Sequence, residues 1–184
     1  MTGNAQSDPL TLSIFRMAAN SVLGARRFTD RFVRQLASNA RNQRILEIGS
    51  GKATNGAHLK SYKGDFDTTN IFTQSDVNPE YGHEVIDITS MENEEEFDLI
   101  LCLNVLEHVF HLEIAARNLH RATKRSGLVA VVVPALYPLH DEPHDYWRPT
   151  EHGLRRLFSD FKDLEIRNSG IRKLPFMYSV LARK

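Results

Sequence analysis

A glycine-rich turn after a short apolar run is the feature of this chain that most directly suggests chemistry. The apolar run spans residues 45–48, Gly49 and Gly51 follow it, and the next stretch, Ala53 to Tyr62, is compatible with a helix. Glycine lacks Cβ and permits positive φ, so a ligand can approach the backbone of such a turn closely. A strand, a tight turn and a helix N-terminus together predict a site for a nucleotide or a nucleoside.

Glu47, just before the turn, restricts the kind of ligand. A carboxylate at this place repels a pyrophosphate but suits a cationic or hydroxyl-rich group. The dinucleotide fingerprint also fails, because Thr54 stands where its third glycine is required. The phosphate-binding loop pattern fails as well, since no Gly-Lys-Ser/Thr follows at the required distance. The turn therefore favours a nucleoside-type ligand without a pyrophosphate.

A second group of reactive side chains lies in residues 134–150. This segment holds two His, two Asp, one Glu and the only Trp of the chain. Loops with many titratable and aromatic groups near a ligand are candidates for function. We expect His144 to act as a general base where one is needed, with His140 as the second candidate. A metal site built from this segment has no geometry fixed by the sequence, and no metal is expected.

The elements that must position these residues alternate between strand and helix. Alternation of this kind predicts an α/β domain of three layers with a mostly parallel sheet. Ligands then bind beyond the carboxyl ends of the strands. The predicted strands are 45–48, 70–77, 84–88, 97–104, 128–133, 164–168 and 176–182; the predicted helices are 10–23, 28–36, 53–62, 113–125 (capped by Gly127) and 150–158 (with Thr150 as N-cap).

From about residue 44 to 184 the chain resembles the class I S-adenosylmethionine-dependent methyltransferases. The family's third glycine is replaced by Ala53, which is a small change. The resemblance implies a Rossmann-like three-layer sandwich with a seven-stranded sheet and an antiparallel last strand. It rests on five features in order along the chain: Glu47-x-Gly49-x-Gly51, Asp76, Asp87, the stretch from Phe97 to Val109, and the closing Val-Leu-Ala-Arg-Lys.

The resemblance implies S-adenosylmethionine as the cofactor. Glu47 would serve its cationic end, Asp76 its ribose hydroxyls and Asp87 its adenine amine. Turn capping is the alternative role for both Asp residues, and a structural role is the alternative for His108. The expected cofactor-binding residues are Glu47, Gly49, Ser50, Gly51, Asp76, Val77, Asp87, Ile88, Asn104 and His108.

The acceptor is expected to lie against the segment 134–150. Tyr146 and Trp147 would form its walls, and Arg148 would either hold an anionic acceptor or pair with Asp145, which would lock the loop onto the next helix. Similar His-x-x-Pro-x-Asp-Tyr-Trp-Arg-x-Thr stretches occur in bacterial methyltransferases of glycan or small-molecule biosynthesis. We therefore expect O-methylation of a small-molecule or glycan-type acceptor. The alternatives are a protein or RNA methyltransferase and a non-catalytic module that binds S-adenosylmethionine.

Length and composition predict one domain over residues 1–184, with residues 1–43 as a helical lid and 44–184 as the cofactor-binding core. Cys102 is the only cysteine and lies in an apolar strand pattern, so a buried thiol is expected. The formal net charge is zero, so no nucleic-acid partner is expected. No apolar run approaches the ~20 residues of a membrane span, which favours a cytoplasmic protein without a membrane partner.

Overall fold

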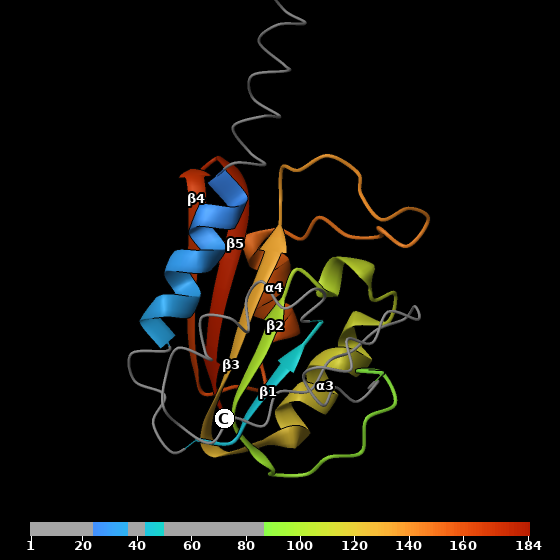
Figure 1. Ribbon diagram of the computed structural model, residues 1–184, viewed down its shortest axis with the longest axis vertical. Coiled ribbons are helices and arrows are strands. Elements are labelled where there is room, and N and C mark those ends of the chain that lie inside the picture. The colour runs from blue at the N-terminus through green and yellow to red at the C-terminus, as the bar shows by residue number, and fades with distance from the viewer. Residues whose placement is uncertain (1–23, 37–42, 50–86) are drawn as a thin grey trace, which may run out of the picture.

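The computed structural model describes residues 24–36, 43–49 and 87–184. Their strands form one five-stranded sheet in the order β1-β2-β3-β5-β4 (Figure 1). The alternation of strand and helix that the sequence predicts is thus present. The strands are β1 (Ile45–Ile48), β2 (Phe97–Leu103), β3 (Thr123–Pro134), β4 (Asp163–Ile171) and β5 (Leu174–Arg183).

The sheet is mixed, with a single strand running against the others. β1 pairs with β2 and β2 with β3 in parallel, whereas β5 is antiparallel to both β3 and β4. Four of the five described strands therefore point the same way. The predicted strand at 70–77 and most of the one at 84–88 lie outside the described residues, so the count of seven stays a prediction. Ile88 itself lies in a turn.

Helices cover both faces of this sheet. On one face pack α3 (Leu112–Ala122) and α4 (Glu151–Leu157), whose buried Leu119 and Leu154 share an apolar core with Ile100 and Val131. On the other face lies the helix 24–36, drawn in blue in Figure 1. Its residue Val33 is fully buried against β1, β2 and β3. These three layers confirm a Rossmann-like α/β fold.

The end of α3 differs from the prediction. We expected this helix to continue to Arg125 with Gly127 as its cap, but it ends at Ala122 and Thr123 begins β3. The Thr123 hydroxyl donates to the Leu119 carbonyl at 2.7 Å, which satisfies the helix end without a glycine. Gly127 lies inside β3, where an added Cβ would come within 2.8 Å of Thr123 Cγ2. Its small size therefore serves strand packing.

The N-terminal helix reaches further than predicted, because residues 24–27 already belong to it. Its first turn lies at the carboxyl end of the parallel strands, and the rest crosses the face of the sheet (Figure 1). The expected helix at 10–23 lies outside the described residues. The lid therefore stays a prediction for that segment. The expected N-cap of α4 is confirmed, since Thr150 Oγ1 accepts a hydrogen bond from the Gly153 backbone at 3.2 Å.

Candidate active site

Glu47 is a buried carboxylate at the carboxyl end of β1. The residue is 1 % exposed, and neither of its carboxylate oxygens has a hydrogen-bond partner among the described residues. Burial raises the pKa of Glu47 to about 7. An unpartnered carboxylate in such a place is costly unless a ligand supplies a positive charge or donors. Its position therefore suits the ammonium-bearing ligand expected from the sequence.

Gly49, two residues later, forms the turn. Its φ is +68°, and an added Cβ would stand 2.3 Å from Val105 Cγ2. Both the left-handed backbone and this close approach require glycine here. The turn after β1 is thus packed directly against the segment that follows β2.

That second segment is a tight one. Asn104 adopts a positive φ of 55°, a conformation that Asn tolerates better than most residues. Its backbone N–H donates to the Val132 carbonyl at 2.8 Å. The chain then enters the 3-10 helix η2 (Leu106–His108). This sharp turn carries Glu107 inward, where its side chain is fully buried and both oxygens lack a hydrogen-bond partner among the described residues. Burial raises the pKa of Glu107 to about 8.

The segment 135–150 is held over η2 by hydrogen bonds from its own backbone and by an ion pair within the segment. The Glu107 carbonyl accepts from the backbone N–H groups of Tyr146 at 2.8 Å and Trp147 at 3.2 Å. Asp145 takes two hydrogen bonds of 2.6 Å from Arg148, and these bonds hold the Asp145 pKa well below its usual range. The same ion pair raises the pKa of Arg148. Of the two roles left open for Arg148, the structure thus shows the pairing with Asp145.

A cavity of about 390 Å³ opens between these elements. Its walls come from the ends of β2 and β3, from η2 and from the first turn of the helix 24–36. The lining residues nearest the chemistry are Asn104, Glu107, His108, Tyr137, His140 and Asp141, with Ala25, Arg26 and Thr29 on the helix side. The cavity therefore lies at the carboxyl edge of the sheet, where ligands of this fold class bind.

The structure places the two candidate general bases, His140 and His144, in different surroundings. His140 lines the cavity, and its Nε2 is 3.9 Å from Glu107 Oε1. His144 is exposed; its Nδ1 lies 2.7 Å from the Tyr146 hydroxyl, and it is not among the cavity-lining residues. The geometry thus favours His140 over His144, against the order expected from the sequence.

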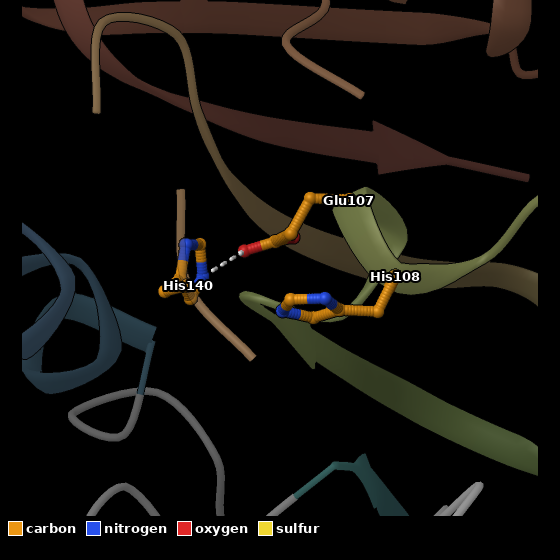
Figure 2. Close-up of side chains that lie close together, drawn as sticks. All are labelled: Glu107, His108 and His140. Carbon is orange, nitrogen blue, oxygen red and sulfur yellow. Dashed lines mark ion pairs between the residues drawn. The ribbon is translucent and has the colours of Figure 1, made fainter. Parts of the chain in front are cut away.

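The tautomer of His140 follows from its neighbours. Its Nδ1 lies 3.3 Å from Asp145 Oδ2 and 3.2 Å from the Pro138 carbonyl oxygen. Arg148 Nη2, a donor, also lies 3.5 Å from this nitrogen, but the two acceptors are closer and favour the tautomer with the proton on Nδ1. The lone pair of Nε2 then points toward Glu107 and the cavity (Figure 2).

Tyr146 and Trp147, which we expected to form the walls of the acceptor site, make other contacts. Trp147 donates through Nε1 to the Val109 carbonyl at 3.1 Å. Tyr146 and Trp147 both pack against the exposed ring of Phe110, at centroid distances of 5.4 and 6.1 Å. Neither is among the residues that line the cavity. These contacts hold the segment in place, and Tyr137 lines the cavity instead.

Only some of the residues that we expected to bind the cofactor's nucleoside lie in the described part of the chain. Asp87 accepts from the backbone N–H and the hydroxyl of Thr89, both at 2.8 Å, so it caps a turn. Ile88 is 1 % exposed and packs in the apolar core beneath α3. Their roles toward adenine stay predictions. Ser50, Gly51, Asp76 and Val77 lie outside the described residues.

Glu107, Tyr137 and Asp141 were not assigned to the site from the sequence. For Glu107 a signal was present, because a charged residue stands inside the apolar run Val105-Leu106-Glu107-His108-Val109. Charged residues in such a run are seldom fully buried unless paired or functional. Tyr137 and Asp141 gave no comparable signal, since polar residues are ordinary in a loop.

Comparisons with known proteins agree with the fold and with the expected family and cofactor. Residues 23–172 match the family described as the methyltransferase domain, and the chain belongs to this family. The predictions of a class I, S-adenosylmethionine-dependent methyltransferase and of S-adenosylmethionine as its cofactor are confirmed. No curated sequence matches the chain at a significant level. None of the helices in the described part of the chain has the length and apolar character that a membrane crossing demands.

Solved structures share the fold at low identity. A possible exported protein from Bordetella parapertussis is 18 % identical with a TM-score of 0.70, over 100 % of this chain and 75 % of that one. A SAM-dependent methyltransferase from Archaeoglobus fulgidus is 13 % identical with a TM-score of 0.65, over 87 % and 94 %. The 1,6-didemethyltoxoflavin-N1-methyltransferase of Burkholderia thailandensis, solved with S-adenosylhomocysteine, is 17 % identical with a TM-score of 0.61, over 100 % and 93 %.

Proposed function

We propose that the enzyme transfers the methyl group of S-adenosylmethionine to an oxygen atom of a small-molecule or glycan-type acceptor. The observation that carries this proposal is the cavity beside Glu107 and His140, with its volume of about 390 Å³. Cavities of this order of size are typical of small-molecule sites. A cavity of this size accommodates one sugar or aromatic ring.

In this proposal the cofactor lies across the turn after β1. Glu47 would hold its ammonium group, and the backbone N–H of Gly49 at the turn would suit its carboxylate. The contact between Gly49 and Val105 supports this arrangement, because it brings the cofactor turn next to η2 and the cavity. The activated methyl group then points into the cavity.

The acceptor hydroxyl loses its proton to His140. Nε2 of this ring carries the free lone pair, and Asp145 together with the Pro138 carbonyl holds the opposite nitrogen. The acceptor oxygen forms a bond to the methyl carbon as the carbon–sulfur bond breaks, which leaves S-adenosylhomocysteine. Alignment of oxygen, carbon and sulfur is the main contribution of the protein.

The test compares two histidine variants of the same segment, His140→Asn and His144→Asn. Formation of S-adenosylhomocysteine is followed with a panel of phenols, sugars, carboxylic acids and amines. We expect activity on a hydroxyl acceptor and a loss of about 100-fold or more in kcat for His140→Asn, as for removal of a general base. A loss confined to His144→Asn would return the role to that residue, and activity on amines alone would reject O-methylation.

One observation favours a second candidate, a macromolecular acceptor. Arg27, Arg31 and Arg34 are exposed along one side of the helix 24–36, which borders the cavity through its first turn. A basic face of this kind suits an acidic protein or RNA. This candidate predicts binding that weakens steeply with salt and is lost in the triple Arg→Gln variant.

The remaining finer predictions belong to the same proposal. Residues 10–23 would continue the wall that the helix 24–36 begins, so that residues 1–43 cover the site as a lid. Two further strands from residues 50–88 would complete a seven-stranded sheet in one domain. Cell fractionation would test the expected cytoplasmic location.

A further inference from the structure

Three side chains with metal-binding chemistry converge at the cavity wall. One ligand atom each from Glu107, His108 and His140 lies within 4.8 Å of the other two (Figure 2). Glu107 and His108 come from η2, whereas His140 comes from the segment after β3. The fold thus brings residues from distant parts of the chain to one point. Two imidazoles and one carboxylate are the ligands of many catalytic zinc and manganese sites.

The Glu107 carboxylate is the first independent sign of a further partner. Its side chain is fully buried, and both oxygens lack a hydrogen-bond partner among the described residues. The Arg148 guanidinium attracts the Glu107 carboxylate but forms no hydrogen bond with it, because Asp145 takes two of its hydrogen bonds and the Tyr137 and Pro138 carbonyls take others. A cation bound at Glu107 would supply the charge that balances the carboxylate.

The orientation of the two imidazoles is the second sign. His108 Nδ1 lies 2.8 Å from the carbonyl oxygen of His144, and His140 Nδ1 lies beside Asp145 and the Pro138 carbonyl. Histidine ligands usually donate their other ring N–H to a carbonyl or carboxylate in this way. Nε2 is thus the nitrogen that each ring has left for an ion, and in His140 it lies 3.9 Å from Glu107 Oε1.

The distances fit one ion after a small contraction. Ligand atoms about 2.0–2.1 Å from a tetrahedral ion lie roughly 3.4 Å from each other. Here Glu107 Oε1 and His140 Nε2 are 3.9 Å apart, and the three ligand atoms all lie within 4.8 Å of one another. Each atom would have to shift by at most about 1 Å. Asp141 Oδ2, 4.0 Å from His108 Nε2, stands next to the cluster as a further oxygen.

We propose that Glu107, His108 and His140 bind a divalent first-row transition-metal ion, with an open position that faces the cavity. Three protein ligands leave room for one oxygen of water or of the acceptor. This inference rests on the proposed function only for the identity of the acceptor. With the ion bound, His140 would hold the ion in place of accepting the proton, the ion would make the acceptor hydroxyl acidic, and the proton would pass to solvent water. Ion binding itself does not depend on methyl transfer.

The test is calorimetric titration of the full chain, freed of metal with EDTA, with Zn²⁺, Mn²⁺ and Mg²⁺. We expect one ion per chain, bound most tightly for Zn²⁺ and most weakly for Mg²⁺. Glu107→Gln and His140→Asn should each weaken Zn²⁺ binding by about 100-fold or more. His144→Asn is the matched control from the same segment and should change the affinity by less than about 3-fold.

A second measurement uses the unaltered protein. In ¹⁵N-histidine spectra, Zn²⁺ should shift the Nε2 signals of two of the eight histidines. S-adenosylhomocysteine is titrated into the same samples, so that a failed ion site and a failed cofactor site are told apart. No stoichiometric ion binding by the unaltered chain, or equal binding in Glu107→Gln, would overturn the inference. Loss in His144→Asn alone would also overturn it, because the ion would then belong to the exposed part of the segment.

Discussion

Two buried glutamates stand at the carboxyl ends of neighbouring parallel strands, and their surroundings differ. Glu47 in β1 and Glu107 after β2 are each 1 % exposed, and burial raises their pKa values to about 7 and about 8. Glu107 faces His140 and lies under a segment held by its own ion pair. Neither carboxylate has a hydrogen-bond partner among the described residues, but Glu107 also has charged groups of the protein, Arg148, Asp145 and Asp141, close enough to shift its pKa. The protein itself organises the region around Glu107, whereas the region around Glu47 is suited to a ligand that brings the counterpart.

The two regions also touch. Gly49, beside Glu47, and Val105, beside Glu107, approach so closely that no side chain fits at position 49. A ligand bound at the turn after β1 is therefore adjacent to the cavity after β2. In the proposed function, this contact places the cofactor next to the acceptor.

The largest expected effect is in the segment over η2. Asp145→Asn removes one partner of a mostly buried ion pair. Because Arg148 is left uncompensated, we expect a loss of about 3–5 kcal/mol in the free energy of unfolding, measured by urea denaturation. Asp141→Asn is the control, because its side chain is 82 % exposed. That exposed change should cost at most about 0.5 kcal/mol. Equal effects would show that the ion pair does not organise this region.

The next largest expected effect is a dependence of stability on pH that is caused by Glu47. Its folded-state pKa of about 7 exceeds the ordinary value of 4.5, so the folded protein holds the proton more tightly. The contribution of Glu47 to stability is fully present below the ordinary pKa and falls by about 3 kcal/mol as pH rises through the folded-state pKa. Urea denaturation at pH values from below the ordinary pKa to above the folded-state one should show this fall relative to Glu47→Gln. Parallel pH curves for the two proteins would mean that Glu47 is solvated.

A smaller effect on stability is expected for the contact between Gly49 and Val105, where the two regions meet. Gly49→Ala forces a side chain into left-handed backbone and against Val105. We expect this change to cost about 2 kcal/mol in the free energy of unfolding, measured by thermal unfolding. In a Val105→Ala background the same change should cost about 1 kcal/mol less, because the close contact is gone. Additive effects would show that the two regions are not in contact.

The smallest effect lies at the end of the segment over η2. Thr150 caps α4 through its hydroxyl. Thr150→Ala should therefore lower the free energy of unfolding by about 1 kcal/mol. Thr150→Ser retains the hydroxyl and serves as the control in the same urea experiment. A cost as large as that of Asp145→Asn would mean that the cap, and not the ion pair, fixes the segment.

Strands were predicted well where burial dictates the residue types. β2 is apolar on both faces, as a buried parallel strand must be, and its bounds differ from the prediction by one residue. The end of α3 was misplaced because Thr123 closes the helix through its own hydroxyl. Sequence patterns favour a glycine for that purpose.

The candidate site was predictable in part. The signal for Glu47 and Gly49 lies in the residues immediately around them. The turn after β1 could therefore be predicted from the sequence alone. The choice between His140 and His144 depends on how the segment folds back over η2, which the long-range hydrogen bonds to the Glu107 carbonyl decide. No local pattern encodes those bonds. The apolar residues beside Glu107 indicated its burial, but the sharp turn at Asn104, which carries its side chain inward, could not be predicted from them.

The most direct test of the account is calorimetric titration of S-adenosylhomocysteine into the unaltered chain, Glu47→Gln and Asp76→Ala, with NAD as the comparison ligand. The account predicts that the unaltered chain binds S-adenosylhomocysteine and does not bind NAD. It predicts an affinity about 10- to 100-fold weaker in Glu47→Gln, as for loss of a hydrogen bond to a charged group. Unchanged affinity in Glu47→Gln, or a preference for NAD, would contradict it.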